Sequence, residues 1–270
     1  MAFINHAAKS IAIKIVYYGP GLSGKTTNLR YIYSKLDAGS RGDLICLETN
    51  TERTLFFDLL PIKAGLIRDY KVHFQLLTVP GQVFYEASRK SVLKGADGII
   101  FVADSQIPLI DANLENFDGL RKNLLEYNVD LNAIPLVFQY NKRDLENLIP
   151  VETFNNLLNP RKLPYVEASA INGAGVLESL KEMAKLVVPV VREKLFEEER
   201  EPVEMEEKIE KEKKKEKPPE IKIEKKKEVE FAEEKKTQPM RVTKIKFKSS
   251  KDLEDELEKL AKEFTGTKKS

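Results

Sequence analysis

The run from Gly19 to Thr27, Gly-Pro-Gly-Leu-Ser-Gly-Lys-Thr-Thr, carries the residue types and spacing that most directly indicate chemistry. It matches G-x-x-x-x-G-K-[ST], a pattern typical of loops that bind nucleotide phosphates. Glycines let the backbone aim consecutive N–H groups at phosphate oxygens, the lysine reaches the terminal phosphates, and the threonine hydroxyl is a ligand for Mg²⁺. The predicted phosphate-binding residues are Gly19, Gly21, Leu22, Ser23, Gly24, Lys25, Thr26 and Thr27.

Two later segments predict which base the nucleotide carries. One is Asn-Lys-Arg-Asp at 141–144 and the other is Ala-Ser-Ala at 168–170, and each follows an apolar run of strand length. An aspartate carboxylate accepts two N–H bonds from the edge of guanine, whereas adenine offers no such pair, so a site built around Asp144 should reject ATP. We expect Asn141 to brace the loop and the Ala170 amide to bind guanine O6. The predicted guanine-binding residues are Asn141, Lys142, Asp144, Ser169 and Ala170.

A third segment, Thr-Val-Pro-Gly-Gln at 78–82, ends another predicted strand and indicates hydrolysis. The Gly81 amide is placed to bind the γ-phosphate, and Gln82 to orient the attacking water in line with the leaving group. We therefore predict that Gln82 is catalytic and that Gly81 binds phosphate.

The polar stretch before residue 55 predicts the second hydroxyl ligand of Mg²⁺. Thr54 is the preferred candidate beside Thr26, with Thr49 and Thr51 as alternatives. In this interpretation Thr54 closes over the γ-phosphate only when that group is present. The predicted cofactor is Mg²⁺, with GTP as substrate and GDP as product.

The elements that position these motifs follow from apolar runs. Strands are predicted at 11–18, 44–47, 72–79, 98–103, 134–140 and 165–166. Helical periodicity is predicted from within the phosphate loop to 36, around 120–127, and from Val176 up to Pro189. Strands that are apolar on both faces and alternate with helices indicate an α/β fold with a mostly parallel central sheet, in which ligands bind beyond the carboxyl ends of the strands. The three motifs all fall at such ends.

Charge is distributed unevenly along the 270 residues. Residues 197–270 contain 22 of the 43 acidic and 22 of the 45 basic side chains, which leaves residues 1–196 with an ordinary globular composition. Such a charged segment cannot bury enough apolar surface to offset chain entropy. We expect one domain at 1–196 and a charged, largely disordered tail at 197–270, with an amphipathic helix near 252–264.

Composition also indicates in which cellular compartment the protein acts and which classes of partner it is expected to have. The net charge of +2 gives no argument for a nucleic-acid partner, and no stretch approaches the 18 apolar residues of a transmembrane segment. Cys46 is the single cysteine, so an intramolecular disulfide is impossible and a reducing interior is expected. These features predict a cytoplasmic protein.

The order and spacing of the motifs resemble the Ras-like small GTPases, whose fold is the P-loop G domain. In detail they are similar to the bacterial MglA-like branch, which acts in gliding motility and cell polarity. The resemblance rests on residues 19–27, 51–61, 78–88, 97–106 and 141–145. Most Ras-like proteins open the D-x-x-G motif with an aspartate that holds a water on Mg²⁺, whereas this chain has Thr78. MglA-like proteins share that threonine, so a place for Thr78 in the outer coordination sphere of the metal is left open.

The resemblance implies further roles. It implies that Arg53 acts as a built-in arginine finger when a dimeric roadblock-type, MglB-like activator binds. It also implies recruitment to a cell pole and slow turnover without the activator. We therefore predict a GTP-hydrolysing switch that recruits polarity or motility effectors in its GTP state. The alternatives are a GTP-gated scaffold with negligible hydrolysis and a small-molecule phosphotransferase, against which the Asn141–Asp144 motif argues.

Overall fold

A computed structural model describes residues 2–46, 57–80 and 86–213 of the chain, with side chains described as far as residue 196. All of these lie in the first of two units, Met1–Glu216. The described strands are β1 Phe3–Asn5, β2 Ser10–Tyr18, β3 Ile45–Cys46, β4 Asp58–Ile67, β5 Tyr70–Thr78, β6 Gly98–Asp104, β7 Leu136–Asn141 and β8 Tyr165–Glu167. The described helices are α1 Lys25–Lys35, α2 Glu86–Leu93, the short 3₁₀ helix η2 Ile107–Leu109, α3 Ile110–Leu125, α4 Val151–Leu157 and α5 Val176–Lys213.

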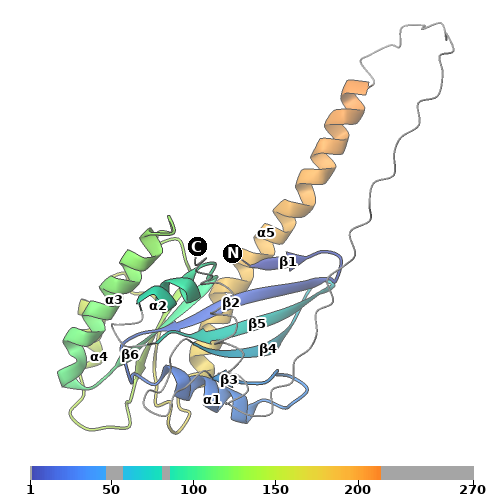
Figure 1. The fold of residues 1–270 in the computed structure, drawn as a ribbon. Coiled ribbons are helices and arrows are strands. Elements are labelled where there is room, and N and C mark those ends of the chain that lie inside the picture. Colours follow the sequence, from blue (N-terminus) through green and yellow to red (C-terminus); the bar gives the residue numbers. More distant parts are fainter. Residues whose placement is uncertain (1, 47–56, 81–85, 214–270) are drawn as a thin grey trace, which may run out of the picture. The chain divides into compact units, whose positions relative to one another are not determined.

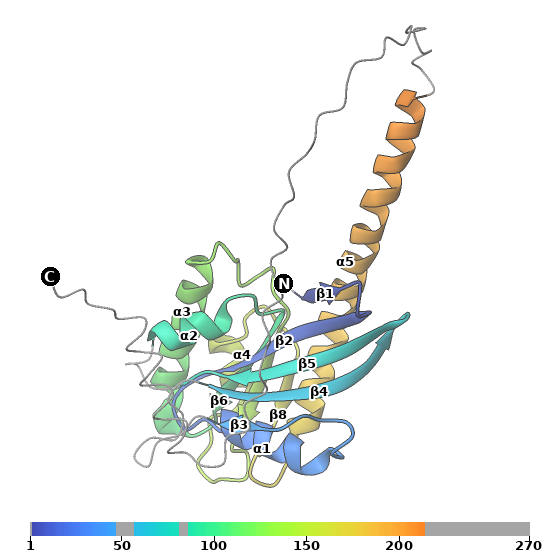
Figure 2. The same cartoon turned by 45° about the vertical axis from the view of Figure 1, so that its right-hand side comes forward.

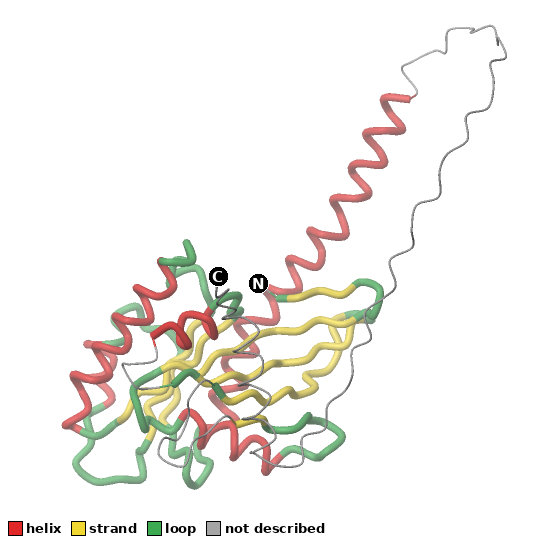
Figure 3. The backbone as a smooth tube through the Cα atoms, viewed as in Figure 1, coloured by secondary structure: helices red, strands yellow, loops and turns green. Residues whose placement is uncertain are grey.

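The described strands form one sheet in the order β3-β4-β5-β2-β6-β7-β8, with β1 paired to β2 (Figures 1 and 2). Strands β5, β2, β6, β7 and β8 run parallel to their neighbours in this series, whereas β4 and β3 are antiparallel additions at one side. The predicted α/β fold with a mostly parallel sheet is confirmed. The carboxyl ends of β2, β5, β6, β7 and β8 meet at one edge, where the loops that follow them gather (Figure 3).

Helices cover both faces of the sheet, with α1 and α5 on one side and α2, α3 and α4 on the other (Figure 1). Side chains of a strand point alternately to its two faces. On β2, Ile13, Ile15 and Tyr17 pack toward α1 and α5, whereas Val16 and Tyr18 pack into the opposite layer. This two-sided burial explains why the central strands read as continuous apolar runs in the sequence.

Helix α5 differs from the expectation that it would end at Pro189. It continues to Lys213, so the predicted domain boundary after residue 196 falls inside it. A proline within a helix costs about 3 kcal/mol because one backbone hydrogen bond is lost. Beyond it, however, Val191 is 2% exposed and Leu195 is fully buried, and each such side chain contributes about 1.5–3 kcal/mol. Burial of Val191 and Leu195 therefore stabilises the helix by more than Pro189 destabilises it.

The sequence did not predict strand β4, which lies between its antiparallel partners β3 and β5. It also did not predict strand β1 or helices α2 and α4. Leu60 and Ile62 of β4 are buried, but Gly65 and a register irregularity between Lys63 and Gly65 interrupt the alternation.

Within the described ranges, no helix combines the length and apolar character needed to cross a membrane. Residues 214–270, including the predicted helix near 252–264, lie outside the described residues.

If α5 is held past Pro189 by core packing, shortening Leu195 should destabilise the domain. We expect Leu195→Ala to lower the free energy of unfolding by about 2–5 kcal/mol because it leaves a cavity. Urea unfolding followed by circular dichroism measures this. Val190, which is 45% exposed on the same helix, gives the matched control, and Val190→Ala should change stability by less than about 0.5 kcal/mol. Equal effects would mean that the helix is not docked at Leu195.

Candidate functional site

The phosphate loop connects the end of β2 to the start of α1. Its glycines are required by close backbone approaches: a Cβ on Gly19 would lie 2.2 Å from the carbonyl oxygen of Val102, and a Cβ on Gly24 would lie 2.2 Å from Nδ2 of Asn141. Gly24 has a φ of 100° and caps α1 without a side-chain hydrogen bond. The first N–H groups of α1 are therefore not capped by a side chain, which is the arrangement that binds anions at helix N-termini.

Lys25 lies inside this loop and is 6% exposed. Its Nζ donates hydrogen bonds to the carbonyl oxygens of Gly19 at 2.9 Å and Pro20 at 2.6 Å. Burial lowers the pKa of Lys25 to about 7, Arg89 adds to this effect, and Asp58 opposes it. A buried amine that donates only to neutral carbonyls favours an anionic ligand, because a nearby phosphate stabilises its charged form.

Asp58, the first residue of β4, joins the phosphate loop to β5. Its Oδ2 accepts hydrogen bonds from the hydroxyls of Thr26 at 2.6 Å and Thr78 at 2.7 Å, and its backbone N–H donates to the Thr78 hydroxyl at 2.9 Å. Asp58 is fully buried, and no described residue donates to its Oδ1. A buried carboxylate with one unpaired oxygen requires a further partner, because an unmatched charged group is costly to bury.

The hydrogen bond from Thr78 to Asp58 gives Thr78 a role that the sequence did not indicate. Most Ras-like proteins have a carboxylate at that position, and this chain has Thr78 instead. The structure supplies a carboxylate from Asp58 on the neighbouring strand, in contact with Thr26. Sequence reasoning missed Asp58, although the missing aspartate at 78 was itself a signal that another acid had to replace it.

Asn141, at the end of β7, holds the phosphate loop and the predicted base-binding loop together. Its Nδ2 donates to the carbonyl oxygen of Ser23 at 2.7 Å, and its Oδ1 accepts the N–H of Ala170 at 2.8 Å. The side chain is 1% exposed. One amide therefore fixes the relative positions of three loops that come from distant parts of the sequence.

The residues after Asn141 are also fixed by specific contacts. Lys142 has a φ of 68° and forms an ion pair of 2.6 Å with Asp104, which is 1% exposed at the end of β6. Asn113 holds Asp104 in turn, by hydrogen bonds to its backbone N–H and carbonyl. Sequence analysis did not single out Asp104 as a partner of this loop, since it lies 38 residues from Lys142 in the chain.

Asp144 is exposed, and its Oδ1 accepts a hydrogen bond of 2.6 Å from the Ser169 hydroxyl. This bond orients the carboxylate, while the N–H of Ala170, the second predicted contact to guanine, donates to Asn141. The structure thus brings Asn141, Lys142, Asp144, Ser169 and Ala170 to the same edge of the sheet as the phosphate loop.

The remaining predicted site residues are not all placed. Arg53, Thr54, Gly81 and Gln82 lie outside the described residues, as do the alternatives Thr49 and Thr51. Among the residues that the structure describes, no group of three or more His, Cys, Asp or Glu side chains could hold a metal ion. Mg²⁺ usually has few protein ligands, and phosphate oxygens of the substrate complete its coordination sphere. One hydroxyl and one carboxylate from the protein are therefore enough to fit this ion.

Comparison with known proteins agrees with this geometry. The model of the Ras family matches residues 46–189, more than half of the chain, and the chain belongs to that family of small GTPases. It is 57% identical over 188 residues to the "Mutual gliding-motility protein MglA" of Myxococcus xanthus (strain DK1622), covering 70% of this chain and 96% of that protein. It is 25% identical over 182 residues to the "Ras-related protein Rab-7b" of Bos taurus, covering 65% of this chain and 82% of that protein. The predicted MglA-like membership is confirmed.

The double contact of Asn141 leads to a stability prediction. Asn141→Ala leaves the Ser23 carbonyl and the Ala170 N–H without their buried partner, so we expect a loss of about 1–3 kcal/mol in the free energy of unfolding of nucleotide-stripped protein. Denaturant titration measures it. Asn172→Ala is the control, because Asn172 is exposed and accepts only a local bond from the Ala174 N–H. If the two variants were equally stable, the loops would not be joined through Asn141.

Proposed function

We propose that this chain is a GTP-binding and GTP-hydrolysing molecular switch that recruits effectors in its GTP state and acts in gliding motility and cell polarity. The observation that carries this proposal is the placement of Asn141 between the phosphate loop and the base loop. One ligand that has both a polyphosphate and a guanine is the chemistry that such a joint site fits. The similarity to a mutual gliding-motility protein supports the cellular role.

In this proposal the phosphates lie on the N-terminus of α1. The backbone N–H groups of Gly21, Leu22, Ser23 and Gly24 bind the oxygens, and Lys25 turns from the Gly19 and Pro20 carbonyls to the β- and γ-phosphates. The N–H groups of Thr26 and Thr27 extend this contact. Phosphate binding by the buried lysine is electrostatically favourable, because the hydrogen bonds that Lys25 makes to Gly19 and Pro20 go to neutral carbonyls.

The residues present fit a magnesium ion. The hydroxyl of Thr26 and the Oδ1 of buried Asp58, to which no described residue donates, are oxygen ligands of the kind that Mg²⁺ prefers. Thr54 would supply the second hydroxyl, and Thr78 would act through its hydrogen bond to Asp58. When bound, the ion neutralises charge on the phosphates. Asp58 keeps the Thr26 hydroxyl oriented, since that hydroxyl donates its proton to Oδ2.

The base is selected by Asp144. Ser169 occupies one lone pair of Oδ1, so both carboxylate oxygens can still accept an N–H group of guanine. The Ala170 N–H, which donates to Asn141 Oδ1 in the described structure, would be shared with guanine O6. Asn141 and the ion pair of Lys142 with Asp104 hold this loop in position. Adenine would leave the carboxylate unpaired, so ATP should compete weakly.

For hydrolysis, Gln82 orients the attacking water, Gly81 binds the γ-phosphate, and Arg53 supplies positive charge when an MglB-like dimeric activator orders it. Turnover is slow without that activator. When the γ-phosphate leaves, its contacts with Thr54 and Gly81 are lost, so effectors recognise one state only. We place this cycle in the cytoplasm, with recruitment to a cell pole and no nucleic-acid partner.

Hydrolysis is tested by single-turnover phosphate release from GTP-loaded protein with an MglB-like activator. We expect release to slow by at least about tenfold in Gln82→Leu, because the water is no longer oriented. Gln75→Leu, at an exposed position of β5, should leave the rate unchanged. If the unmodified protein binds GTP but releases no phosphate with the activator, the chain is a GTP-gated scaffold instead.

The role of Asp58 is tested separately by the effect of Mg²⁺ on GDP dissociation. In the unmodified protein, Mg²⁺ at about 1 mM or above should slow GDP release, and in Asp58→Asn this slowing should shrink by about tenfold because one charged ligand oxygen is lost. Asp43→Asn, at an exposed acidic position, serves as the control. An unchanged magnesium dependence with an intact fold would limit Asp58 to a structural role.

A further inference from the structure

A cavity of about 190 Å³ lies between α3 and the connection that follows α4. Phe117 and Phe138 form part of its apolar lining, and Leu125 and Leu163 contribute on either side. It is placed beside Leu136, the first residue of β7, and beside the segment that precedes β8. The cavity is therefore at the amino ends of these parallel strands, at the edge of the sheet opposite the nucleotide site.

The walls of the cavity are held by their own hydrogen bonds. Asn159 donates from Nδ2 to the carbonyl oxygen of Leu163 and accepts the Leu163 N–H at Oδ1, both at 2.8 Å, which closes the 159–163 connection. Across the cavity, the carboxylate of Asp130 accepts the backbone N–H and the side-chain amide of Asn132. A site whose walls are already ordered loses little entropy when it is occupied.

Two arginines, Arg121 of α3 and Arg161 of the connection, line the cavity. Among the residues that the structure describes, neither guanidinium takes part in an ion pair or a hydrogen bond. The nearby Asp118 pairs with Lys122 at 2.8 Å, although it also feels the charge of Arg121. Asp130 accepts hydrogen bonds from the neutral Asn132 and keeps its negative charge, so the charged groups of the lining sum to +1. The cavity therefore combines an aromatic interior with two positive groups that lack a partner.

Size and charge together define the occupant. Pockets for small ligands usually measure roughly 300–1,000 Å³, so this cavity fits one bulky side chain better than a whole metabolite. An aromatic anchor in a small pocket, flanked by charged pairs, is the usual pattern of a protein interface. We propose that the cavity docks an acidic segment of a partner protein, which inserts one bulky apolar side chain and pairs its carboxylates with Arg121 and Arg161.

The position of the cavity has a consequence for regulation. The loops that contact the nucleotide are at the carboxyl ends of the strands, whereas this cavity is at their amino ends, behind the aromatic packing of Phe117, Phe138 and Tyr140. The partner is therefore held in both nucleotide states, unlike an effector. This inference is independent of whether the chain hydrolyses GTP.

The test uses the peptide acetyl-Glu-Asp-Trp-Glu-Asp-amide and the full chain loaded with GDP or with a non-hydrolysable GTP analogue. Because the chain contains no tryptophan, indole fluorescence reports only the environment of the peptide anchor. We expect a saturable blue shift with a Kd below about 1 mM, equal in the two nucleotide states. Arg121→Gln and Arg161→Gln should each weaken binding about tenfold, the usual effect of losing a hydrogen bond to a charged group.

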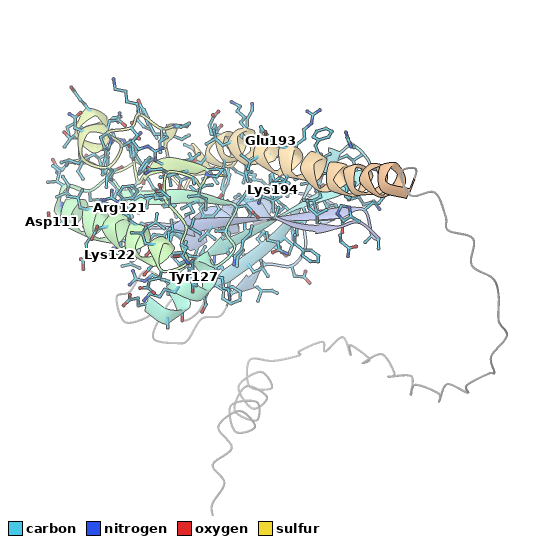
Figure 4. The ribbon with its side chains drawn as sticks, turned by 90° about the horizontal axis from the view of Figure 1, so that it is seen from above. Asp111, Arg121, Lys122, Tyr127, Glu193 and Lys194 are labelled. Atoms are coloured by element: carbon cyan, nitrogen blue, oxygen red, sulfur yellow. The ribbon has the colours of Figure 1, made fainter. Side chains whose placement is uncertain are left out.

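Matched controls separate docking from general charge attraction. Lys122→Gln changes the neighbouring base on α3, which Figure 4 labels beside Arg121, and should alter affinity less than about twofold. A peptide with alanine in place of tryptophan should not bind. Absence of binding, equal losses in all three variants, or a strong preference for one nucleotide state would each overturn the proposal. Self-association of the chain that is abolished by Arg161→Gln would overturn it too, by assigning the cavity to a second copy.

Discussion

The geometry of the site depends on the buried side-chain amide of Asn141. It bonds the carbonyl of Ser23 on one side and the N–H of Ala170 on the other, so the two loops cannot move apart without leaving buried polar groups unpaired. Gly24 makes this contact sterically feasible, because any side chain there would occupy the place of the Asn141 amide nitrogen. Gly24 and Asn141 are 117 residues apart in the chain, and the contact between the two loops requires both of them.

A second polar layer lies beneath that unit and extends it into the core. The amides of Asn28 and Gln139 bond each other reciprocally, at 2.8 and 2.9 Å, and Gln139 also donates to the hydroxyl of Ser179 on α5. Asn28 donates in addition to the carbonyl of Gly24. Such buried networks stabilise one arrangement when every member is satisfied, and this one connects the phosphate loop to α5.

Much of this architecture was predictable because it depends on local patterns. Apolar runs long enough to be buried on both faces gave β2, β5, β6 and β7, and the phosphate loop and the Asn141 motif fall where such strands end. The role of Asp58 could not be predicted in that way, because it depends on the pairing of β4 with β5, which places Asp58 in contact with Thr78. The length of α5 was missed for the opposite reason: Pro189 is a strong local signal, but burial of Val191 and Leu195 depends on the rest of the domain.

The contact between Asp58 and Thr78 also constrains which residue this chain can accept at position 78. A Thr78→Asp change in the present chain would bring two carboxylates together in a buried place, where they cannot both stay ionised at low cost. Losing Asp58 would remove the carboxylate that accepts the hydroxyls of Thr26 and Thr78. An aspartate at position 78 of this chain would therefore also need a change at Asp58. Diagnostic templates for such proteins should accordingly match a carboxylate by its position in space rather than in the sequence.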